Sequence, residues 1–368
     1  MPIFNKGEFL KLLSKGEENL IENLKIDLEK YETISLAKND GFSNEYLNAM
    51  LIALKGNNSI REIDLTEIGE VTEEGGMALA EFLTKNILNR LNLRGNNIHQ
   101  GVIIALGEAL KKNTSLVYMN LSLTDLKNEG ALALAQGLEI NKTLKYLNLT
   151  GNKGIGLKGV RALTESLKVN NSLIALELAD LQINTISIEL MAEVLKINRS
   201  LTSLDLSGNI ISSIAIKALL DALEVNPLLV SLKIGSDRYI EYIEYEDLLK
   251  TIKSNPFLSI ELKLLPQTDY LGDKAVIDIK EALAENKACK ELYEEIKTGK
   301  LGFIGREEIV NFIQDIEEKI KDSGKEIKQH FRKITEEMKT ILNLSGKPDR
   351  KFADMVTEAQ PRPPLTRG

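Results

Sequence analysis

A stretch of 28 or 29 residues recurs along the chain and restricts the possible folds more than any other feature. In its plainest copy, Leu144, Leu147 and Leu149 have the spacing of a short strand whose alternate side chains are buried. A polar turn and an amphipathic helix follow, and the helix ends at Asn170. The middle strand position recurs in phase at Ile34, Ile63, Leu91, Met119, Leu147, Leu176, Leu204, Leu232 and Ile260. Such a repeat predicts a solenoid in which each strand–turn–helix unit stacks on the one before it.

The repeat divides the chain into predicted segments. Residues 1–30 carry apolar side chains at helical spacing and predict an N-terminal helical cap, in preference to a partner-binding helix. Residues 31–265 hold the array of about nine repeats. Residues 266–302 predict a degenerate repeat and a helical C-terminal cap, with Asn286 as a helix-ending asparagine and Cys289 as a small core residue. Residues 346–368 are polar and proline-rich and predict a disordered tail.

Residues 303–345 form a different module, in which apolar residues step by three or four and charged residues lie between them. This is a heptad-like seam, which is typical of paired helices. The segment Asp322-Ser323-Gly324 interrupts the seam. Two structures fit: an antiparallel helical hairpin, which we favour, or a long kinked helix that pairs with another chain. The second would give self-association through residues 303–343.

Composition narrows the functional classes. The net charge of −7 argues against sequence-independent nucleic-acid binding. A single cysteine allows no disulfide within the chain and fits a reducing compartment. The first 20 residues lack the apolar core of a signal peptide, and no run approaches the length of a membrane span. These features predict a cytoplasmic protein without a membrane span or a nucleic-acid partner.

Three apparent motifs are better explained by the repeat. Residues 154–159 spell G-x-G-x-x-G before a helix, but Gly159 stands eleven residues before a helix-ending asparagine, as Gly75 and Gly130 do. We therefore interpret it as a helix-start glycine rather than part of a dinucleotide site. The glycosylation-like sequences at Asn141 and Asn198 also fall on helix-ending asparagines, for which we expect the left-handed conformation.

No catalytic constellation is visible in the sequence. The two histidines, His99 and His330, lie in different modules, and neither has a partner at metal-ligand spacing. We therefore predict a non-enzymatic protein without a cofactor or a metal ion.

The outward side of the strands is the remaining candidate surface, because strand side chains alternate between the two faces of a sheet. Arginine and tyrosine, which are enriched at binding hot spots, gather on three neighbouring strands. We predict that they anchor a protein partner, which lays a basic or bulky element across a low floor of alanines and serines; the alternative is a solvated face. The candidate partner-binding residues are Arg90, Asn92, Arg94, Tyr118, Asn120, Tyr146, Asn148, Glu177 and Asp205.

Residues 31–290 resemble the ribonuclease-inhibitor type of leucine-rich repeat, most closely in the segments NKTLKYLNLTGNKGIGLKGVRALTESLKVNNSL and NRSLTSLDLSGNIISSIAIKALLDALEVN. The resemblance implies an α/β horseshoe solenoid with a parallel β-sheet on its concave face, helices on its convex face and, here, an α-helical C-terminal module. It also implies protein binding on the concave face. The turn asparagine of the family is kept at Asn39, Asn96, Asn152 and Asn209. Other residues replace it in the remaining repeats, which predicts less regular turns at Ile68, Thr124, Leu181 and Asp237.

Particular branches of the family fit less well. Ribonuclease inhibitors are rich in cysteine and tryptophan, whereas this chain has one cysteine and no tryptophan. Ran GTPase activators share the repeat but usually end in an acidic segment, which is missing here. Similar arrays occur among effectors that intracellular bacteria deliver into the host cytoplasm, and the Lys-, Asn- and Ile-rich composition is compatible with that role. We predict a protein-interaction scaffold; the alternative is a regulator of a small GTPase.

Overall fold

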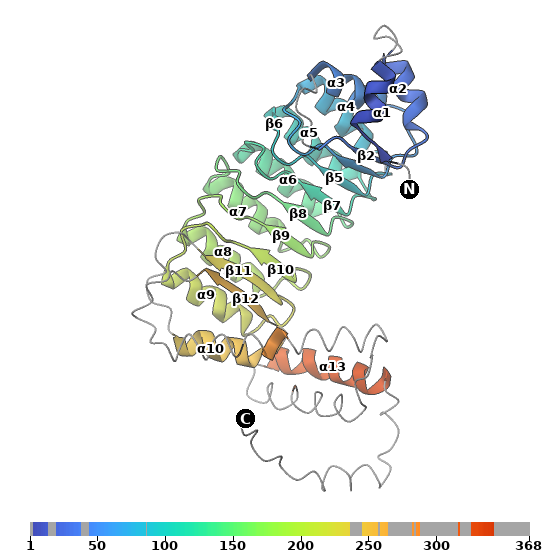
Figure 1. The fold of residues 1–368 in the computed structure, drawn as a ribbon. Coiled ribbons are helices and arrows are strands. Elements are labelled where there is room, and N and C mark those ends of the chain that lie inside the picture. Colours follow the sequence, from blue (N-terminus) through green and yellow to red (C-terminus); the bar gives the residue numbers. More distant parts are fainter. Residues whose placement is uncertain are drawn as a thin grey trace, which may run out of the picture.

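In the computed structural model, ten parallel strands form one sheet, in the order β1-β2-β3-β5-β7-β8-β9-β10-β11-β12 (Figure 1). The structure describes residues 3–13, 20–37, 44–85, 87–235, 245–256, 258–263, 282, 285–287, 316 and 325–341. The strands of the sheet are β1 (Ile3–Phe4), β2 (Thr33–Ser35), β3 (Glu62–Asp64), β5 (Arg90–Asn92), β7 (Tyr118–Asn120), β8 (Tyr146–Asn148), β9 (Ala175–Glu177), β10 (Ser203–Asp205), β11 (Ser231–Gly235) and β12 (Ser259–Lys263). A second, two-stranded sheet pairs β4 (Glu70–Val71) with β6 (Asn97–Ile98).

Helices connect successive strands and cover one face of the large sheet, and no described helix covers the other face (Figure 1). We refer to the uncovered side as the open face. The helices are α1 (Lys6–Leu13), α2 (Leu20–Leu28), α3 (Asn44–Ala53), α4 (Glu73–Leu83), α5 (Gln100–Lys112), α6 (Asn128–Ile140), α7 (Leu157–Ser166), α8 (Thr185–Leu195), α9 (Ser213–Leu223), α10 (Tyr245–Ser254) and α13 (Lys325–Ile341). This arrangement confirms the predicted α/β solenoid.

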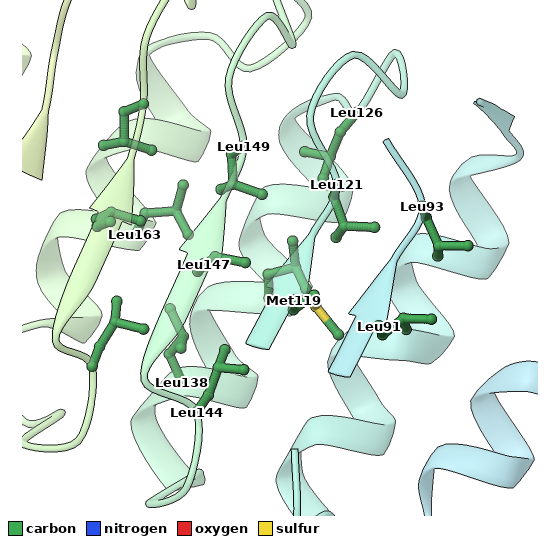
Figure 2. Packing of buried hydrophobic residues seen from close by; sticks show 14 of the residues in the cluster. Leu91, Leu93, Met119, Leu121, Leu126, Leu138, Leu144, Leu147, Leu149 and Leu163 are labelled. Atoms are coloured by element: carbon green, nitrogen blue, oxygen red, sulfur yellow. The ribbon is translucent and has the colours of Figure 1, made fainter. Parts of the chain in front are cut away.

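The strand register follows the repeat. Leu91, Met119 and Leu147 are direct partners on β5, β7 and β8, and the same position pairs from Ile34 on β2 to Ile260 on β12. These side chains are at most 3% exposed and pack against the helices in one continuous core (Figure 2). Because a slip of one residue would move this whole row to the open face, apolar burial fixes the register.

The helix-ending asparagines do not adopt the left-handed conformation that we expected. Asn113 and Asn141 have φ of −74° and −65°, with extended ψ. Their side chains are buried and serve the backbone of two repeats: the Asn141 amide donates to Leu110 O and Asn113 O at 3.0 and 2.8 Å, and its oxygen accepts from the N–H groups of the following turn. The same pattern continues at Asn170 and Asn198. Hydrogen bonding across repeats, rather than backbone conformation, therefore explains this asparagine.

The turns that lack the family's asparagine are less regular, as expected: Gly69, Asp125 and Gln182 have positive φ of 116°, 54° and 58°, at a position where the asparagine turns have none. The fourth such turn, at Asp237, lies outside the described residues. Asn152 donates to Leu149 O in its own turn and to Leu121 O in the preceding one, and its oxygen accepts from Thr124 N and Leu126 N. Asn96 and Asn209 make equivalent bonds to the preceding turns. One asparagine thus satisfies two turns, so the repeats alternate in pairs.

The N-terminal cap contains a strand that the sequence analysis missed. Residues 1–30 were expected to form a helical cap, but Ile3 and Phe4 form β1, which pairs with β2 and extends the sheet by one strand. Phe4 is fully buried, with its ring centroid 5.4 Å from that of Tyr31 and 6.4 Å from that of Phe9. A two-residue strand carries no periodicity of its own, so only its pairing reveals it.

Towards the C-terminus, Asn286 acts like the helix-ending asparagines of the repeats, as its position in the sequence predicted. It is buried and donates to Ile252 O, Asn255 O and Leu258 O at 2.9 to 3.0 Å. Cys289 lies outside the described residues, as do residues 317–324, where a hairpin and a kinked helix would differ. None of the described helices is long and apolar enough to cross a membrane.

Candidate partner-binding face

The strand register aligns the candidate side chains across the open face. Arg90 on β5 is the direct partner of Tyr118 on β7, which pairs with Tyr146 on β8, and Tyr146 pairs with Ala175 on β9. Each of these positions precedes a buried core residue, so its side chain points away from the helices.

Arg90, Tyr118 and Tyr146 form one continuous stack. The two tyrosine rings are nearly parallel, at 3°, with their centroids 4.5 Å apart. The Arg90 guanidinium carbon lies 4.0 Å from the centroid of the Tyr118 ring. The spacing of adjacent strands, about 4.8 Å, matches the spacing of stacked rings, so the sheet itself holds the aromatic pair. The cation adds about 0.5–1 kcal/mol at an exposed site of this kind.

Glu177 on β9 contacts the other end of the stack through a hydrogen bond to Tyr146. The Tyr146 hydroxyl donates to Glu177 Oε1, and the Asn148 amide donates to Glu177 Oε2. Burial of the hydroxyl and its hydrogen bond to this carboxylate raise the pKa of Tyr146 well above its usual value of 10. Tyr146 therefore stays a neutral donor at physiological pH, and the carboxylate holds its ring in place.

Four of the candidates, at the last residue of β5, β7, β8 and β10, stabilise the turns that follow their strands. The side-chain oxygens of Asn92, Asn120 and Asn148 accept from the backbone N–H two residues later, at 3.2, 3.0 and 2.8 Å. Asp205 does the same for Ser207 N at 2.9 Å. Such turns stop the strand and shape the start of the loop. Asn120 and Asn148 are also buried, so these residues support the face more than they present it.

The remaining charged candidates have partners on the face. Asp205 also accepts from the Ser207 hydroxyl, and its second oxygen lies 3.8 Å from Lys233 Nζ on the neighbouring strand. Arg94 lies 3.5 Å from the Ser122 hydroxyl and 4.0 Å from the Glu67 carboxylate. The latter pair is about half exposed on both sides and contributes little to stability.

Beside the stack, the predicted low floor is present. Ala175, Ser203 and Ser231 follow Tyr146 in the same row of strand partners. Ala179, later along the chain from β9, is buried. The change from large to small side chains produces a step on the open face next to Tyr146. Arg90, Arg94, Tyr118 and Tyr146 are the candidates left to contact a partner.

The described residues show no arrangement suited to catalysis. No group of three or more His, Cys, Asp or Glu side chains among them could hold a metal ion. His99 instead caps α5, where its Nδ1 accepts from Gly101 N at 3.3 Å. The G-x-G-x-x-G segment begins α7, and a Cβ at Gly159 would lie 2.9 Å from the Ala131 Cβ of α6. That glycine allows close helix packing.

Sequence reasoning missed two features of the face. It named Glu177 as a partner-binding candidate and did not predict that its carboxylate accepts hydrogen bonds from Tyr146 and Asn148. It also left out Lys233, which lies next to Asp205. Aligning the strands in register would have indicated both features, since Glu177 and Asp205 each lie beside a hydrogen-bond donor on the adjacent strand.

Comparison with known protein families supports the predicted repeat. Residues 112–135, 141–163 and 198–220 match a family model described as Leucine Rich repeat. The chain contains leucine-rich repeats. No curated protein matches it. The ribonuclease-inhibitor subtype stays a prediction.

Two solved structures are similar over about half of the chain. Leiomodin-1 Actin-Binding Site 2 is 21% identical, with a TM-score of 0.40, over 47% of this chain and 95% of that chain. The tropomodulin C-terminal domain from Caenorhabditis elegans is 20% identical, with a TM-score of 0.39, over 47% of this chain and 98% of that chain.

Proposed function

We propose that this protein is a non-enzymatic scaffold that binds a protein partner on the open face of its repeats, with the Arg90–Tyr118–Tyr146 stack as the anchor. The observation that carries the proposal is the stack itself. Large hot-spot side chains are ordered in advance by a cation, a parallel ring and a carboxylate. Pre-ordered side chains lose little conformational entropy on binding, which favours affinity.

The chemistry of the face favours a bulky element over a basic one across the low floor. The carboxylates of Glu177 and Asp205 already accept hydrogen bonds within the protein. A basic partner would therefore compete with these internal donors and, at Asp205, with the Lys233 ammonium group 3.8 Å away. Arg90, which is exposed, can receive a carboxylate or an aromatic ring of the partner, and the step beside Tyr146 can receive an apolar side chain.

The test is capture of a partner from lysate by the full chain, followed by measurement of the affinity of the captured protein. The double variant Tyr118→Ala/Tyr146→Ala is expected to weaken binding about thirtyfold or more, as loss of a hot spot does. The double variant Tyr118→Phe/Tyr146→Phe keeps the rings and is expected to lose less. Glu62→Ala, at the corresponding position of β3 but outside the stack, is the matched control. Equal affinity for all variants would place the binding site elsewhere.

Two narrower roles stay predictions. A regulator of a small GTPase would change the rate of nucleotide hydrolysis across a panel of such enzymes, and no change would exclude it. An effector role in a host cytoplasm would be tested by finding the chain inside infected cells.

Self-association through residues 303–343 also stays a prediction. It would be tested by the mass in solution with and without that segment.

A further inference from the structure

One edge of the array carries a charge opposite to that of the whole chain. We define the helix-end rim as the residues one and two positions before, and one position after, the eight asparagines at 57, 86, 113, 141, 170, 198, 226 and 255. Because the strands pair in register, these positions follow one another along the edge where the strands begin. In a chain of net charge −7, the rim has two glutamates, Glu139 and Glu224, against nine cations: Lys55, Lys85, Lys111, Lys112, Lys142, Lys168, Lys196, Arg199 and Lys253.

The same rim carries a row of exposed apolar side chains. The residue just before the asparagine is Ile140, Val169, Ile197 and Val225 in four consecutive repeats, with exposed fractions of 55, 58, 58 and 37%. In the two repeats before them this position is a lysine, at 85 and 112. With helix axes about 8–10 Å apart, the apolar row extends over roughly 25 Å. Aliphatic side chains at this exposure contribute little to the core, so folding does not account for them.

The backbone under this row is held firmly. The asparagine that follows each apolar residue is buried and bonded to the backbone of two repeats, as at Asn141, Asn170 and Asn198. The Asn226 amide likewise donates to Leu195 O and Asn198 O. The apolar side chains therefore project from a fixed edge rather than from a loose loop.

Several lysines of the rim already pair with glutamates, and Lys55 lies 3.6 Å from Glu81 on the neighbouring helix. Lys168 and Lys196 lie 2.6 Å from glutamates one turn earlier on their own helices, and Lys111 lies 2.5 Å from Glu108. The side chains of these pairs are 24–64% exposed, and such pairs contribute little to stability, so another anion can replace the glutamate at small cost. Lys142 Nζ contacts the Glu139 carbonyl at 3.3 Å. Cations at helix C-termini also complement the helix dipole, which explains part of the charge but not the apolar row.

The composition of the rim matches a lipid surface better than a protein interface. The centre of a protein interface is depleted in lysine, whereas this rim places lysines between its exposed aliphatic side chains. Aliphatic side chains flanked by lysines are typical of protein surfaces that lie on anionic membranes, because the stems enter the interface while the ammonium groups meet the headgroups.

We propose that the helix-end rim docks on the surface of an anionic lipid membrane, with Ile140, Val169, Ile197 and Val225 inserted at the level of the headgroups. The contact is peripheral, which agrees with the absence of a membrane-spanning helix among the described helices. The open face does not form part of the rim, so a docked molecule can still bind its protein partner. The proposal does not depend on the function proposed above.

The test is co-sedimentation of the full chain with vesicles of phosphatidylcholine, with and without phosphatidylserine. We expect binding only with phosphatidylserine, and weaker binding at high salt. The variant Ile140→Ser/Val169→Ser/Ile197→Ser is expected to lower the binding constant about tenfold or more. The control Met77→Ser/Ile104→Ser/Leu132→Ser removes three side chains that are 42, 39 and 49% exposed on α4, α5 and α6, and should bind like wild type. Circular dichroism verifies that both variants fold.

Three results would overturn the proposal. The first is no binding to either vesicle, and the second is equal binding to both. The third is salt-sensitive binding that the rim variant retains in full, because it would indicate a purely electrostatic ligand such as an acidic protein or a nucleic acid. Tyr118→Ala/Tyr146→Ala is expected to bind vesicles normally, which separates this site from the open face.

Discussion

At the scale of single residues, the buried asparagines show how a polar side chain stabilises a repeat. Asn141 makes two donated and two accepted bonds to backbone groups, and those groups belong to two repeats. Three of the four bonds, those to Leu110 O, Asn113 O and Leu144 N, are buried, and a buried group without a partner costs more than a hydrogen bond contributes when made. One short amide side chain therefore stabilises both the end of a helix and the joint with its neighbour.

Asn141→Ala is expected to lower the free energy of unfolding by ~3 kcal/mol, because it leaves several buried backbone groups unsatisfied. Denaturant unfolding measures the change. Asn171→Ala is the control, since Asn171 is exposed at the corresponding loop of the next repeat; its effect should stay within about 0.5 kcal/mol. Similar losses in both variants would mean that the side-chain bonds of Asn141 are not what stabilises the joint.

The raised pKa of Tyr146 predicts how the stability of the protein depends on alkaline pH. Its pKa is raised in the folded protein, mainly by burial and by the carboxylate of Glu177, whereas an unfolded tyrosine ionises near pH 10. Above about pH 10 the unfolded state loses this proton first, so stability falls as the pH rises. The stabilising contribution is complete below that pH and is lost as the pH rises through the raised pKa.

The measurement for Tyr146 is the ultraviolet absorbance of tyrosinate during titration of folded wild type and Tyr146→Phe. Their difference isolates one tyrosine, whose midpoint is expected above that of an ordinary tyrosine. Glu177→Gln removes the carboxylate charge and is expected to lower that midpoint. An ordinary midpoint in the wild type would contradict the hydrogen bond to Glu177.

At the scale of elements, repeats cooperate in pairs. In the repeats without the turn asparagine, Glu67, Leu123 and Asp180 adopt positive φ of 54–57°, and the next repeats have Gly95, Gly151 and Gly208 at the equivalent place. A side chain at each of these glycines would collide with the residue before it in the stack. The larger residue of one repeat therefore fits beside the glycine of the next. In the same way, the turn without an asparagine is bonded by the asparagine of the next repeat.

Close packing of α5 on α6 depends on glycine. A Cβ at Gly107 would lie 2.6 Å from the backbone carbonyl carbon and oxygen of Ala133, which cannot rotate away. Gly107→Ala is therefore expected to cost about 1–3 kcal/mol by overpacking, although alanine is the better helix former. Gly101→Ala, in the first turn of α5, meets movable side chains and should be close to neutral. Thermal unfolding compares the two; equal stabilities would show that α6 can shift.

The sequence predicted the strands well because their information is local. Leu144, Leu147 and Leu149 define a buried face by alternation alone, and that face determines the register with the next strand. The asparagines were located correctly but explained wrongly, since their bonds reach carbonyls some 30 residues away. The open face was predicted as columns of residues, yet the hydrogen bonds of Tyr146 to Glu177 depend on side-chain positions that no periodicity encodes.

At the scale of the whole molecule, the array is nearly one-dimensional, because each strand pairs only with the strands next to it. Damage at one end should therefore stay near that end. At the N-terminal end the edge strand is β1, which has two residues and covers the edge of β2. Such a short edge strand offers few unpaired backbone groups. The cap thus protects the sheet edge as well as the core.

Phe4→Ala tests this view of the cap. Phe4 is fully buried against Tyr31 and Phe9, so its truncation is expected to cost ~3 kcal/mol locally. Ile3→Ala is the control on the same strand, because Ile3 is half exposed. Native-state hydrogen exchange should become faster in the repeats of β2 and β3 but not around β8 and β9, and binding at the Tyr118–Tyr146 stack should persist. Faster exchange across the whole array would mean that the solenoid unfolds as one unit, and that the cap stabilises the partner-binding face from four strands away.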